Sequence, residues 1–311
     1  MSHAETSPSE TSPSQLRAGD RTFELARRPL LMGVVNASPD SFSDDGSAHT
    51  LDRRVRLAHE LVDAGADILD VGGESARTEI PPVSVEEEIE RVVPLVQRIA
   101  DELAVTVSVD TYKPPVAAAA IDAGAAIVND VSGLRDLALA DICAHTGAAL
   151  VLMHTRAAPK QRLQDPDLYG DVVEDVLAFL RGRIELALAA GVAFEQLLLD
   201  PGPDFAKTPA QTIALLGEVD RLHALGRPLL MAISRKDFIG ALTFRSPRER
   251  LAGTLAALAH GLDRGAHIFR VHDVAAAADF IAVRAALSGE LEPHKNLALA
   301  EDARYERRHE R

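Results

Sequence analysis

The chain has 311 residues and a formal net charge of -14, from 33 basic and 47 acidic residues, which argues against nucleic acid or a membrane surface as a general partner. No apolar run reaches the about 18 residues that a membrane-spanning helix requires. The single cysteine, Cys143, excludes an internal disulfide and favours a cytoplasmic location.

The composition of the chain ends predicts two tails around a single domain. Residues 1–20 begin with a stretch of Ser, Thr, Pro and Glu, which favours a disordered tail without the basic and apolar regions of a signal peptide. Residues 291–311 are rich in charge and predict a mobile C-terminal tail. We therefore expect one folded domain over residues 21–290, a normal size for one barrel.

Eight short apolar runs alternate with helical patterns along this domain. The runs show little alternation of apolar and polar residues, which is typical of parallel strands buried on both faces. Apolar residues between the runs recur at helical spacing, as over residues 85–100 and 173–184. The eight predicted strands cover residues 30–36, 67–73, 105–111, 126–133, 149–154, 197–202, 229–234 and 267–274.

The signals at the helix ends repeat along the chain. Ser84 with Glu87, and Thr208 with Gln211, have the spacing of capping boxes at helix starts. Glycine comes shortly before four of the predicted strands, where it suits a left-handed helix end, at Gly65, Gly124, Gly147 and Gly265. This repeated unit predicts an α/β fold of the (β/α)8, or TIM barrel, class. A doubly wound open sheet is the alternative.

Polar residues stand at the end of every predicted strand. Because the carboxyl ends of barrel strands meet at one mouth, we expect these residues to form a binding site there. They are Asn36, Glu74 to Arg77, Asp110, Asn129 with Asp130, His154, Asp200, Ser234 to Lys236, and Arg270 with His272 and Asp273.

The residue types at this mouth indicate what the site binds. Asp110, Asn129 and Asp200 offer acceptors and an amide, which match the amino-pyrimidinone edge of a flat heterocycle. The cationic or potentially cationic residues there suit a phosphorylated leaving group, and the oxygen of Asn36 suits a magnesium ion shared with phosphate. The cationic set is Lys236, Arg270 and His272. Neither a P-loop, nor a Gly-x-Gly-x-x-Gly after a strand, nor a Cys/His metal spacing occurs in the sequence.

Seven of these strand ends carry motifs that resemble the dihydropteroate synthase family. The resemblance covers about residues 30–288, and its first and last motifs are too long to arise by chance. The motifs are MGVVNASPDSFSD from Met32, LDVGGESARTE from Leu69, SVDTYKPPVA from Ser108, NDVSG from Asn129, DPG from Asp200, SRK from Ser234 and RVHDV from Arg270.

This resemblance implies a magnesium-dependent transferase that joins 6-hydroxymethyl-7,8-dihydropterin diphosphate to 4-aminobenzoate and releases pyrophosphate. It implies that the loops of residues 38–46 and 74–82 close over the substrates, and that the chain forms a homodimer through late helices carrying His260, Leu262 and Phe280. The pterin would be held by Asp110, Asn129, Asp200 and Lys236, and the diphosphate by Asn36, Arg270 and His272, with the magnesium ion on Asn36.

The side of the site that would hold 4-aminobenzoate departs from the family pattern. By the resemblance it comprises Arg77, Phe205, Ser234, Arg235 and Asp237. The family motif STRPG reads Ser75 to Glu79, SARTE, here, and DPGIGFGK reads DPGPDFAK, which introduces Asp204 and Ala206. Asp237 stands where, by the same resemblance, a serine helps to hold the aminobenzoate carboxylate. At ~4 Å and a dielectric constant of about 20, this repulsion costs on the order of 4 kcal/mol unless Arg77 offsets it or Asp237 points away.

Three interpretations follow from this mixture. The first is an ordinary dihydropteroate synthase with a rebuilt second pocket. The second is a paralogue that binds pterin but uses another amine or is not catalytic. The third is a pterin-binding methyltransferase domain, which would not need the SRK and RVHDV motifs that are present.

Overall fold

Eight parallel strands form the centre of the computed structural model, which describes residues 15–26, 28–37, 48–75 and 78–299. Their order in the sheet is β8-β7-β6-β5-β4-β3-β10-β9. A parallel bridge between Leu199 and Leu229 joins the two outer strands, so the sheet is a nearly closed barrel and not an open sheet. The strands are β3 (Leu30–Asn36), β4 (Ile68–Gly72), β5 (Thr106–Asp110), β6 (Ile127–Asp130), β7 (Ala149–Met153), β8 (Leu197–Asp200), β9 (Leu230–Met231) and β10 (Ile268–Val271).

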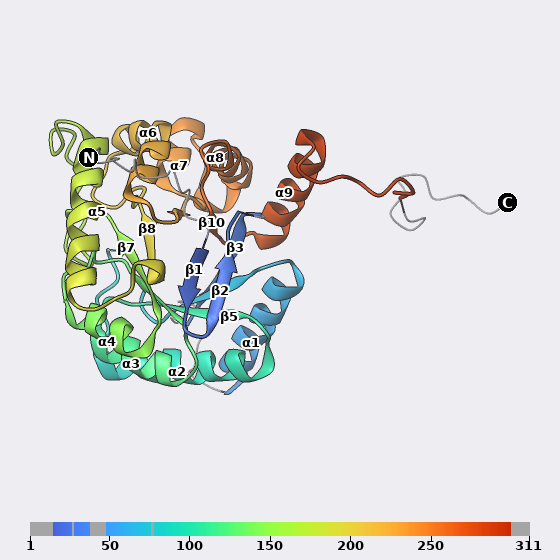
Figure 1. Ribbon diagram of the computed structural model, residues 1–311. Coiled ribbons are helices and arrows are strands. Elements are labelled where there is room, and N and C mark those ends of the chain that lie inside the picture. Colours follow the sequence, from blue (N-terminus) through green and yellow to red (C-terminus); the bar gives the residue numbers. More distant parts are fainter. Residues whose placement is uncertain (1–14, 27, 38–47, 76–77, 300–311) are drawn as a thin grey trace, which may run out of the picture.

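Helices surround this barrel, as Figure 1 shows. Each of the eight barrel strands is followed by at least one α-helix, which confirms the predicted (β/α)8 class, and two α-helices follow β9. The α-helices are α1 (Ala48–Asp63), α2 (Val85–Glu102), α3 (Pro114–Asp122), α4 (Ala138–Thr146), α5 (Val172–Ala189), α6 (Pro209–Gly217), α7 (Asp237–Thr243), α8 (Leu251–Asp263) and α9 (Val274–Ser288). Short 3-10 helices occupy η1 (Phe194–Gln196), η2 (Val219–Leu225) and η3 (Pro247–Glu249).

The helix ends follow from local side-chain chemistry. At α6 the capping box is complete, because Gln211 N donates to Thr208 Oγ1 at 3.2 Å and Thr208 N donates to Gln211 Oε1 at 2.8 Å. At α2 the Ser84 hydroxyl accepts from Glu87 N at 3.1 Å, but the Glu87 carboxylate pairs with Arg91. The four glycines predicted to end helices all have positive φ, between 74° and 112°, a region that side chains disfavour.

A hairpin of β1 (Gln15–Ala18) and β2 (Arg21–Glu24) lies across one end of the barrel (Figure 1). Leu16 and Ala18 are fully buried and pack with the side chains that fill that end, including Met32 and Ile68. The predicted tail of residues 1–20 is therefore wrong for residues 15–20, while residues 1–14 lie outside the described part. The prediction followed the Ser-, Thr-, Pro- and Glu-rich composition of the segment as a whole. It overlooked the alternation over residues 15–18 that turns Leu16 and Ala18 toward the barrel.

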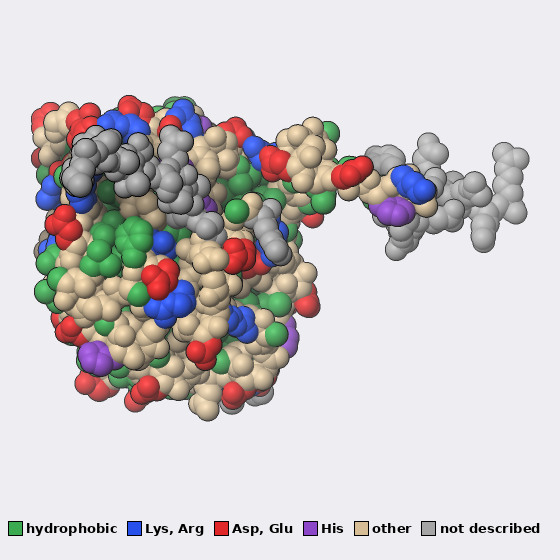
Figure 2. Space-filling model, viewed as in Figure 1, with side chains coloured by type: hydrophobic (Ala, Val, Ile, Leu, Met, Phe, Trp, Pro, Cys, Tyr) green, Lys and Arg blue, Asp and Glu red, His purple; other side chains and the backbone are tan. Residues whose placement is uncertain are grey.

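Beyond α9 the chain leaves the barrel. Residues 290–299 form neither helix nor strand and run away from the domain (Figures 1 and 2). Within the described residues, no helix is long and apolar enough to cross a membrane.

Candidate functional site

The strand register brings the predicted site residues together at one mouth of the barrel. Asp110 at the end of β5 pairs with Gly72 of β4 on one side and with Asn129 of β6 on the other. Asp200 pairs with Met153 at the end of β7. The carboxyl ends of parallel strands share one rim, and these polar groups therefore face a common space.

Arg270 of β10 connects two carboxylates on neighbouring strands. Its Nε donates to Asp70 Oδ2 at 2.6 Å, and its Nη2 donates to Asp110 Oδ2 at 2.8 Å. Asn129 Nδ2 also donates to Asp70 Oδ2, at 3.0 Å. Asp70 therefore orients both Arg270, which is predicted to bind the diphosphate, and Asn129, which is predicted to bind the pterin.

Sequence reasoning missed Asp70. It lies in the middle of β4, is 0 % exposed, and stands among apolar residues. An aspartate in the middle of a predicted buried strand could have indicated a buried ion pair, since a carboxylate is almost never fully buried unless a cation pairs with it. In the described part of the chain its second oxygen, Oδ1, has no hydrogen-bond partner.

Burial controls the charge of this cluster. It raises the pKa of Asp110 to about 7, because Arg270 only partly offsets the desolvation and Asp70 adds repulsion. Burial also acts to lower the pKa of Arg270, but Asp70 and Asp110 outweigh it, so that pKa is raised and the guanidinium stays charged. One cation thus serves two carboxylates, and the mouth retains acceptors for N–H donors of a ligand.

Asp200 and Lys236 complete the set of groups predicted to contact the pterin. Asp200 is 2 % exposed, its Oδ1 accepts from Gly202 N at 2.7 Å, and burial raises its pKa. Lys236 is the N-cap of α7, and its Nζ lies 4.4 Å from the centre of the Phe205 ring. Burial lowers the pKa of Lys236, with Asp204 and Asp200 opposing the shift. The structure therefore brings Phe205 beside Lys236, a residue predicted to bind the pterin.

His272 forms a pair with Ser234. His272 Nδ1 lies 2.9 Å from the Ser234 hydroxyl oxygen, and the same oxygen accepts from the backbone N–H of His272 at 3.2 Å. Burial, followed by the charges of Arg270 and Arg235, lowers the pKa of His272 to about 4. Its imidazole is therefore neutral near pH 7. In this state His272 can form hydrogen bonds but does not carry the positive charge that the sequence analysis considered for it.

Arg235 is turned toward Asp273. Its Nη2 donates to the two carboxylate oxygens of Asp273 at 2.8 and 3.0 Å, and its Nε donates at 3.2 Å. Its backbone has a φ of 59° and its N–H is held by the Thr254 hydroxyl at 3.0 Å. This ion pair fixes the SRK turn at the start of α7.

Asp237 is paired with a cation that the sequence did not suggest. The side chain is 61 % exposed, and its Oδ1 accepts from Arg250 Nη1 at 3.2 Å. Its backbone N–H donates to Asp204 Oδ2 at 2.5 Å. Arg250 therefore offsets part of the charge of Asp237, whereas Arg77, the offset considered from the sequence, lies outside the described residues.

The loop between β8 and α6 has an unusual backbone. Asp204 and Ala206 have φ values of 65° and 51°, at the two positions where the family motif has glycine. A residue with a side chain in this region costs roughly 1–2 kcal/mol. The Asp204 carboxylate is held in turn by Thr212, whose hydroxyl donates to Oδ1 at 3.1 Å.

Three other polar residues at the strand ends serve the loops. Glu74 accepts from Lys113 Nζ at 2.9 Å and from Val83 N at 3.0 Å, which joins the two ends of the second loop. Asp130 accepts from the backbone of Ser132 at 2.8 Å. His154 is fully buried, and its Nδ1 lies 2.7 Å from Nζ of Lys207 in the loop between β8 and α6.

Asn36 ends β3 with an exposed side chain. In the described part of the chain, no three or more His, Cys, Asp and Glu side chains gather in a group that could hold a metal ion. A magnesium ion here would need oxygen ligands beyond the protein, such as phosphate oxygens and water.

Comparison with known proteins places these features in context. A family model described as "Pterin binding enzyme" matches residues 32–272. A dihydropteroate synthase from Synechocystis is 40 % identical over 277 residues, 88 % of this chain and 96 % of the relative. One from Bacillus subtilis is 42 % identical over 85 % of this chain and 88 % of the relative.

Solved structures give the same result. The Xanthomonas albilineans dihydropteroate synthase with 4-aminobenzoic acid superimposes with a TM-score of 0.82 and 43 % identity, over 89 % of this chain and 99 % of that one. The same enzyme in complex with 7,8-dihydropteroate gives a TM-score of 0.78 and 42 % identity, over 88 % and 98 % of the two chains.

Proposed function

The chain belongs to the dihydropteroate synthase family of pterin-binding enzymes, and we propose that it condenses 6-hydroxymethyl-7,8-dihydropterin diphosphate with 4-aminobenzoate to give 7,8-dihydropteroate and pyrophosphate. The relatives and solved structures support this transferase activity along almost the whole barrel. The observation that carries the proposal is the cluster in which Arg270 joins Asp70 and Asp110 beside Asn129.

The pterin ring is assigned to Asp110, Asn129, Asp200 and Lys236. The two carboxylates accept N–H bonds from the heterocycle, while Asn129 and Lys236 donate to its ring nitrogen and carbonyl oxygen. Asp200 is 2 % exposed and the Asp110 side chain is 20 % exposed, which supports the assignment, because a ligand that donates to a desolvated carboxylate replaces water that the carboxylate lost.

The diphosphate is assigned to Arg270 and His272. Nε and Nη2 of Arg270 bond Asp70 and Asp110, so the remaining nitrogen, Nη1, is assigned to the leaving group. His272 is neutral in the absence of substrate, and an adjacent diphosphate would favour its protonated form, because an opposite charge raises the pKa of an imidazole.

A magnesium ion fits this assignment. Asn36 offers one neutral oxygen at the exposed end of β3, and magnesium usually combines one or two protein oxygens with substrate phosphates and water. When bound there with the diphosphate, the ion supplies positive charge that stabilises the departing group.

The reaction breaks the C–O bond between the pterin methylene carbon and the diphosphate, and the electron pair leaves with the diphosphate. The carbon becomes cationic, and the Asp110 and Asp200 carboxylates lower the energy of that charge across the ring. The amine nitrogen of 4-aminobenzoate then forms the new C–N bond and releases a proton to water. The protein therefore acts by positioning and electrostatics, without an enzyme nucleophile.

A second candidate function has specific support. Asp204 and Asp237 lie together on the side assigned to 4-aminobenzoate, through the 2.5 Å bond between Asp204 Oδ2 and Asp237 N. Two carboxylates on this rim favour a paralogue that binds pterin diphosphate but uses a neutral or cationic amine, or that is not catalytic. Phe205, Ser234 and Arg235 would line the same side in both cases.

Pyrophosphate release separates these functions. The purified chain is given pterin diphosphate and magnesium, with and without 4-aminobenzoate. Release that depends on 4-aminobenzoate supports the synthase. Pterin binding without such release supports the paralogue, and the absence of pterin binding overturns both.

Variants test the pterin assignment directly. Asp110→Ala and Asp200→Ala each leave a donor of the heterocycle unpaired, at a cost of ~1–3 kcal/mol, or roughly 5- to 150-fold in pterin Kd by calorimetry. Asp141→Ala, on the exposed surface of α4, is the matched control and should leave Kd unchanged. Unchanged Kd in both mouth variants would place the pterin elsewhere.

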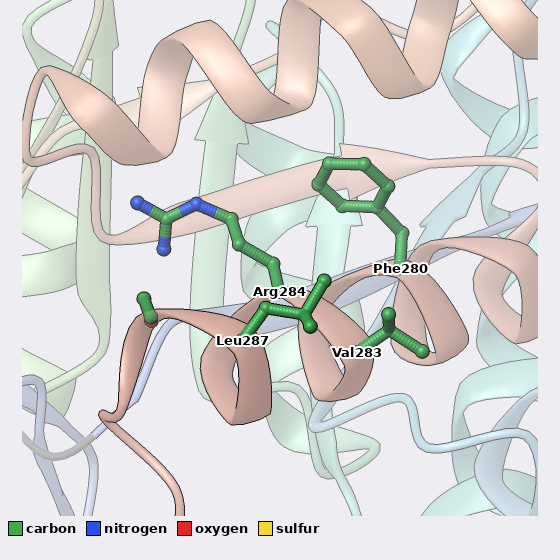
Figure 3. Close-up of a pocket in the computed structure, with 5 residues that line it drawn as sticks. Phe280, Val283, Arg284 and Leu287 are labelled. Carbon is green, nitrogen blue, oxygen red and sulfur yellow. The ribbon is translucent and has the colours of Figure 1, made fainter.

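We also propose a homodimer, with α9 at its interface. The three residues predicted at the interface make contacts within their own barrel. Leu262 and Phe280 pack against the core, and His260 Nε2 lies 2.9 Å from the Leu216 carbonyl oxygen. Val283 and Leu287, however, are 60 % and 84 % exposed, and they project from α9 beside Phe280 and Arg284 (Figure 3). Leu287→Glu should halve the mass measured by sedimentation if this face is buried between two copies.

The proposed setting is the cytoplasm. A single cysteine, buried Cys143, leaves no internal disulfide to require an oxidising compartment. The acidic balance supports small molecules, and not nucleic acid, as ligands. Figure 2 agrees for the face it shows, where basic side chains are scattered among acidic ones.

A further inference from the structure

Lys207 is a buried cation outside the set of residues assigned to the substrates. It is 0 % exposed and is one of the largest fully buried side chains. Its Nζ lies 2.7 Å from His154 Nδ1, and it donates to the carbonyl oxygens of Gly202 at 2.8 Å and Phe205 at 3.1 Å. A fourth acceptor, the His154 carbonyl oxygen, is more distant at 3.4 Å, so the three nearer acceptors match the three hydrogens of an ammonium group.

His154 connects this lysine to α5. His154 Nε2 lies 2.9 Å from Asp175 Oδ1, and the same carboxylate oxygen accepts from Arg156 Nε at 3.0 Å. The carboxylate accepts, so Nε2 carries the ring hydrogen and Nδ1 is left to accept from Lys207. Asp175, His154 and Lys207 therefore form one directed chain of hydrogen bonds.

The two carbonyl groups that Lys207 holds belong to a loop that contacts the proposed pterin site at both ends. Gly202, whose carbonyl accepts from Lys207, donates its own N–H to Asp200. Phe205, held in the same way, places its ring 4.4 Å from Lys236 Nζ. Lys207 is thus linked to two of the groups assigned to the pterin, to Asp200 through Gly202 and to Lys236 through Phe205.

This loop needs such an anchor. Asp204 and Ala206 hold left-handed backbone conformations that side chains disfavour, and Lys207 bonds the carbonyl groups of Gly202 and Phe205, on either side of Asp204. Burial lowers the pKa of Lys207 to about 7, with Asp200 opposing the shift, because holding a charged ammonium in this position costs free energy. An apolar side chain of similar volume would avoid that cost but would leave the carbonyls unpaired.

We propose that Lys207, with His154 and Asp175 behind it, is a positioning unit that orients Asp200 and Lys236 for the pterin. The inference rests on the proposed function for the identity of the ligand. Lys207 itself touches no substrate in this scheme.

The test is the affinity of the full chain for 6-hydroxymethyl-7,8-dihydropterin diphosphate with magnesium, measured by calorimetry. Lys207→Met keeps the volume and removes the bonds, and it should raise Kd at least tenfold. Gln196→Met is the matched control, because Gln196 is 2 % exposed at the opposite end of β8 and donates to the carbonyls of Cys143 at 2.9 Å and Ala148 at 2.7 Å. It should lose comparable stability in urea and keep the original Kd.

Equal rises in Kd for both variants, or an unchanged Kd for folded Lys207→Met, would overturn the inference. If Lys207→Met does not fold, Asp175→Asn decides, since Asp175 lies near the surface. A rise of about threefold in its Kd supports the unit, and an unchanged value overturns it. If the unsubstituted chain does not bind the pterin diphosphate, the proposed function fails, and this inference fails with it.

Discussion

Under the proposed function, we expect the balance of charge between Asp237 and Arg250 to set the affinity for 4-aminobenzoate. At 3.2 Å and a dielectric constant of about 20, the pair attracts by roughly 5 kcal/mol, close to the ~4 kcal/mol by which Asp237 would repel a carboxylate at about 4 Å. Asp237 is 61 % exposed, so water screens both terms and brings each nearer the ~1 kcal/mol measured for exposed pairs. Because the Arg250 side chain is only 11 % exposed, we expect the attraction between the two side chains to lie in the upper part of the range from about 1 to about 5 kcal/mol.

A double-mutant cycle measures this balance. With Arg250 present, Asp237→Ser should change the KM for 4-aminobenzoate by less than about threefold, because the charge is already offset. Arg250→Met should raise KM about five- to tenfold by exposing the Asp237 charge, and Asp237→Ser in that background should restore most of the loss.

Arg250 also donates to the carbonyl oxygens of Arg235 and Lys236, at 2.8 and 3.1 Å, so its removal disturbs the turn as well. The cycle separates the two effects. If Arg250→Met raises KM equally with Asp237 and with Ser at this position, the turn and not the charge is responsible, and the electrostatic reasoning is refuted. A hundredfold gain from Asp237→Ser alone would show that Arg250 does not shield the charge.

Three further predictions concern stability and the mouth. Leu16→Ala should lower the free energy of unfolding by ~2–5 kcal/mol in urea, because the side chain is 0 % exposed inside the barrel; a loss below about 0.5 kcal/mol would mean that the hairpin is not docked in solution. Asp70→Asn removes the buried charge that Arg270 bonds at 2.6 Å, and it should lower kcat/KM for the pterin diphosphate roughly 10- to 100-fold; full activity would show that Asp110 alone positions Arg270. Burial lowers the pKa of His267 from 6.5 to about 4, so its contribution to stability is present above pH 6.5 and is lost as the pH falls toward 4. His267→Asn keeps an acceptor for Leu229 N but cannot be protonated, and it should remove about 2 kcal/mol of the stability lost between pH 7 and 5; identical pH profiles for the two proteins would contradict this.

The sequence by itself determined the repeating architecture. All eight predicted strands are present, and the glycines before four of them have the positive φ that was expected. Two of the polar strand ends, those with Asp110 and Arg270, meet as the sequence predicted. These features are readable because hydrophobic period, helix capping and backbone conformation depend on residues a few positions apart, and barrel closure then fixes where strand ends lie.

Only the tertiary structure decided which side chains pair. Asp70 and Arg270 are 200 residues apart, and Lys207 and His154 are 53 apart, so no local pattern links them. The docking of Leu16 was missed for the same reason, since its burial depends on the barrel end that it covers. Pairing of buried charges is set by distances of a few ångströms between strands and loops, and those distances exist only once the barrel has closed.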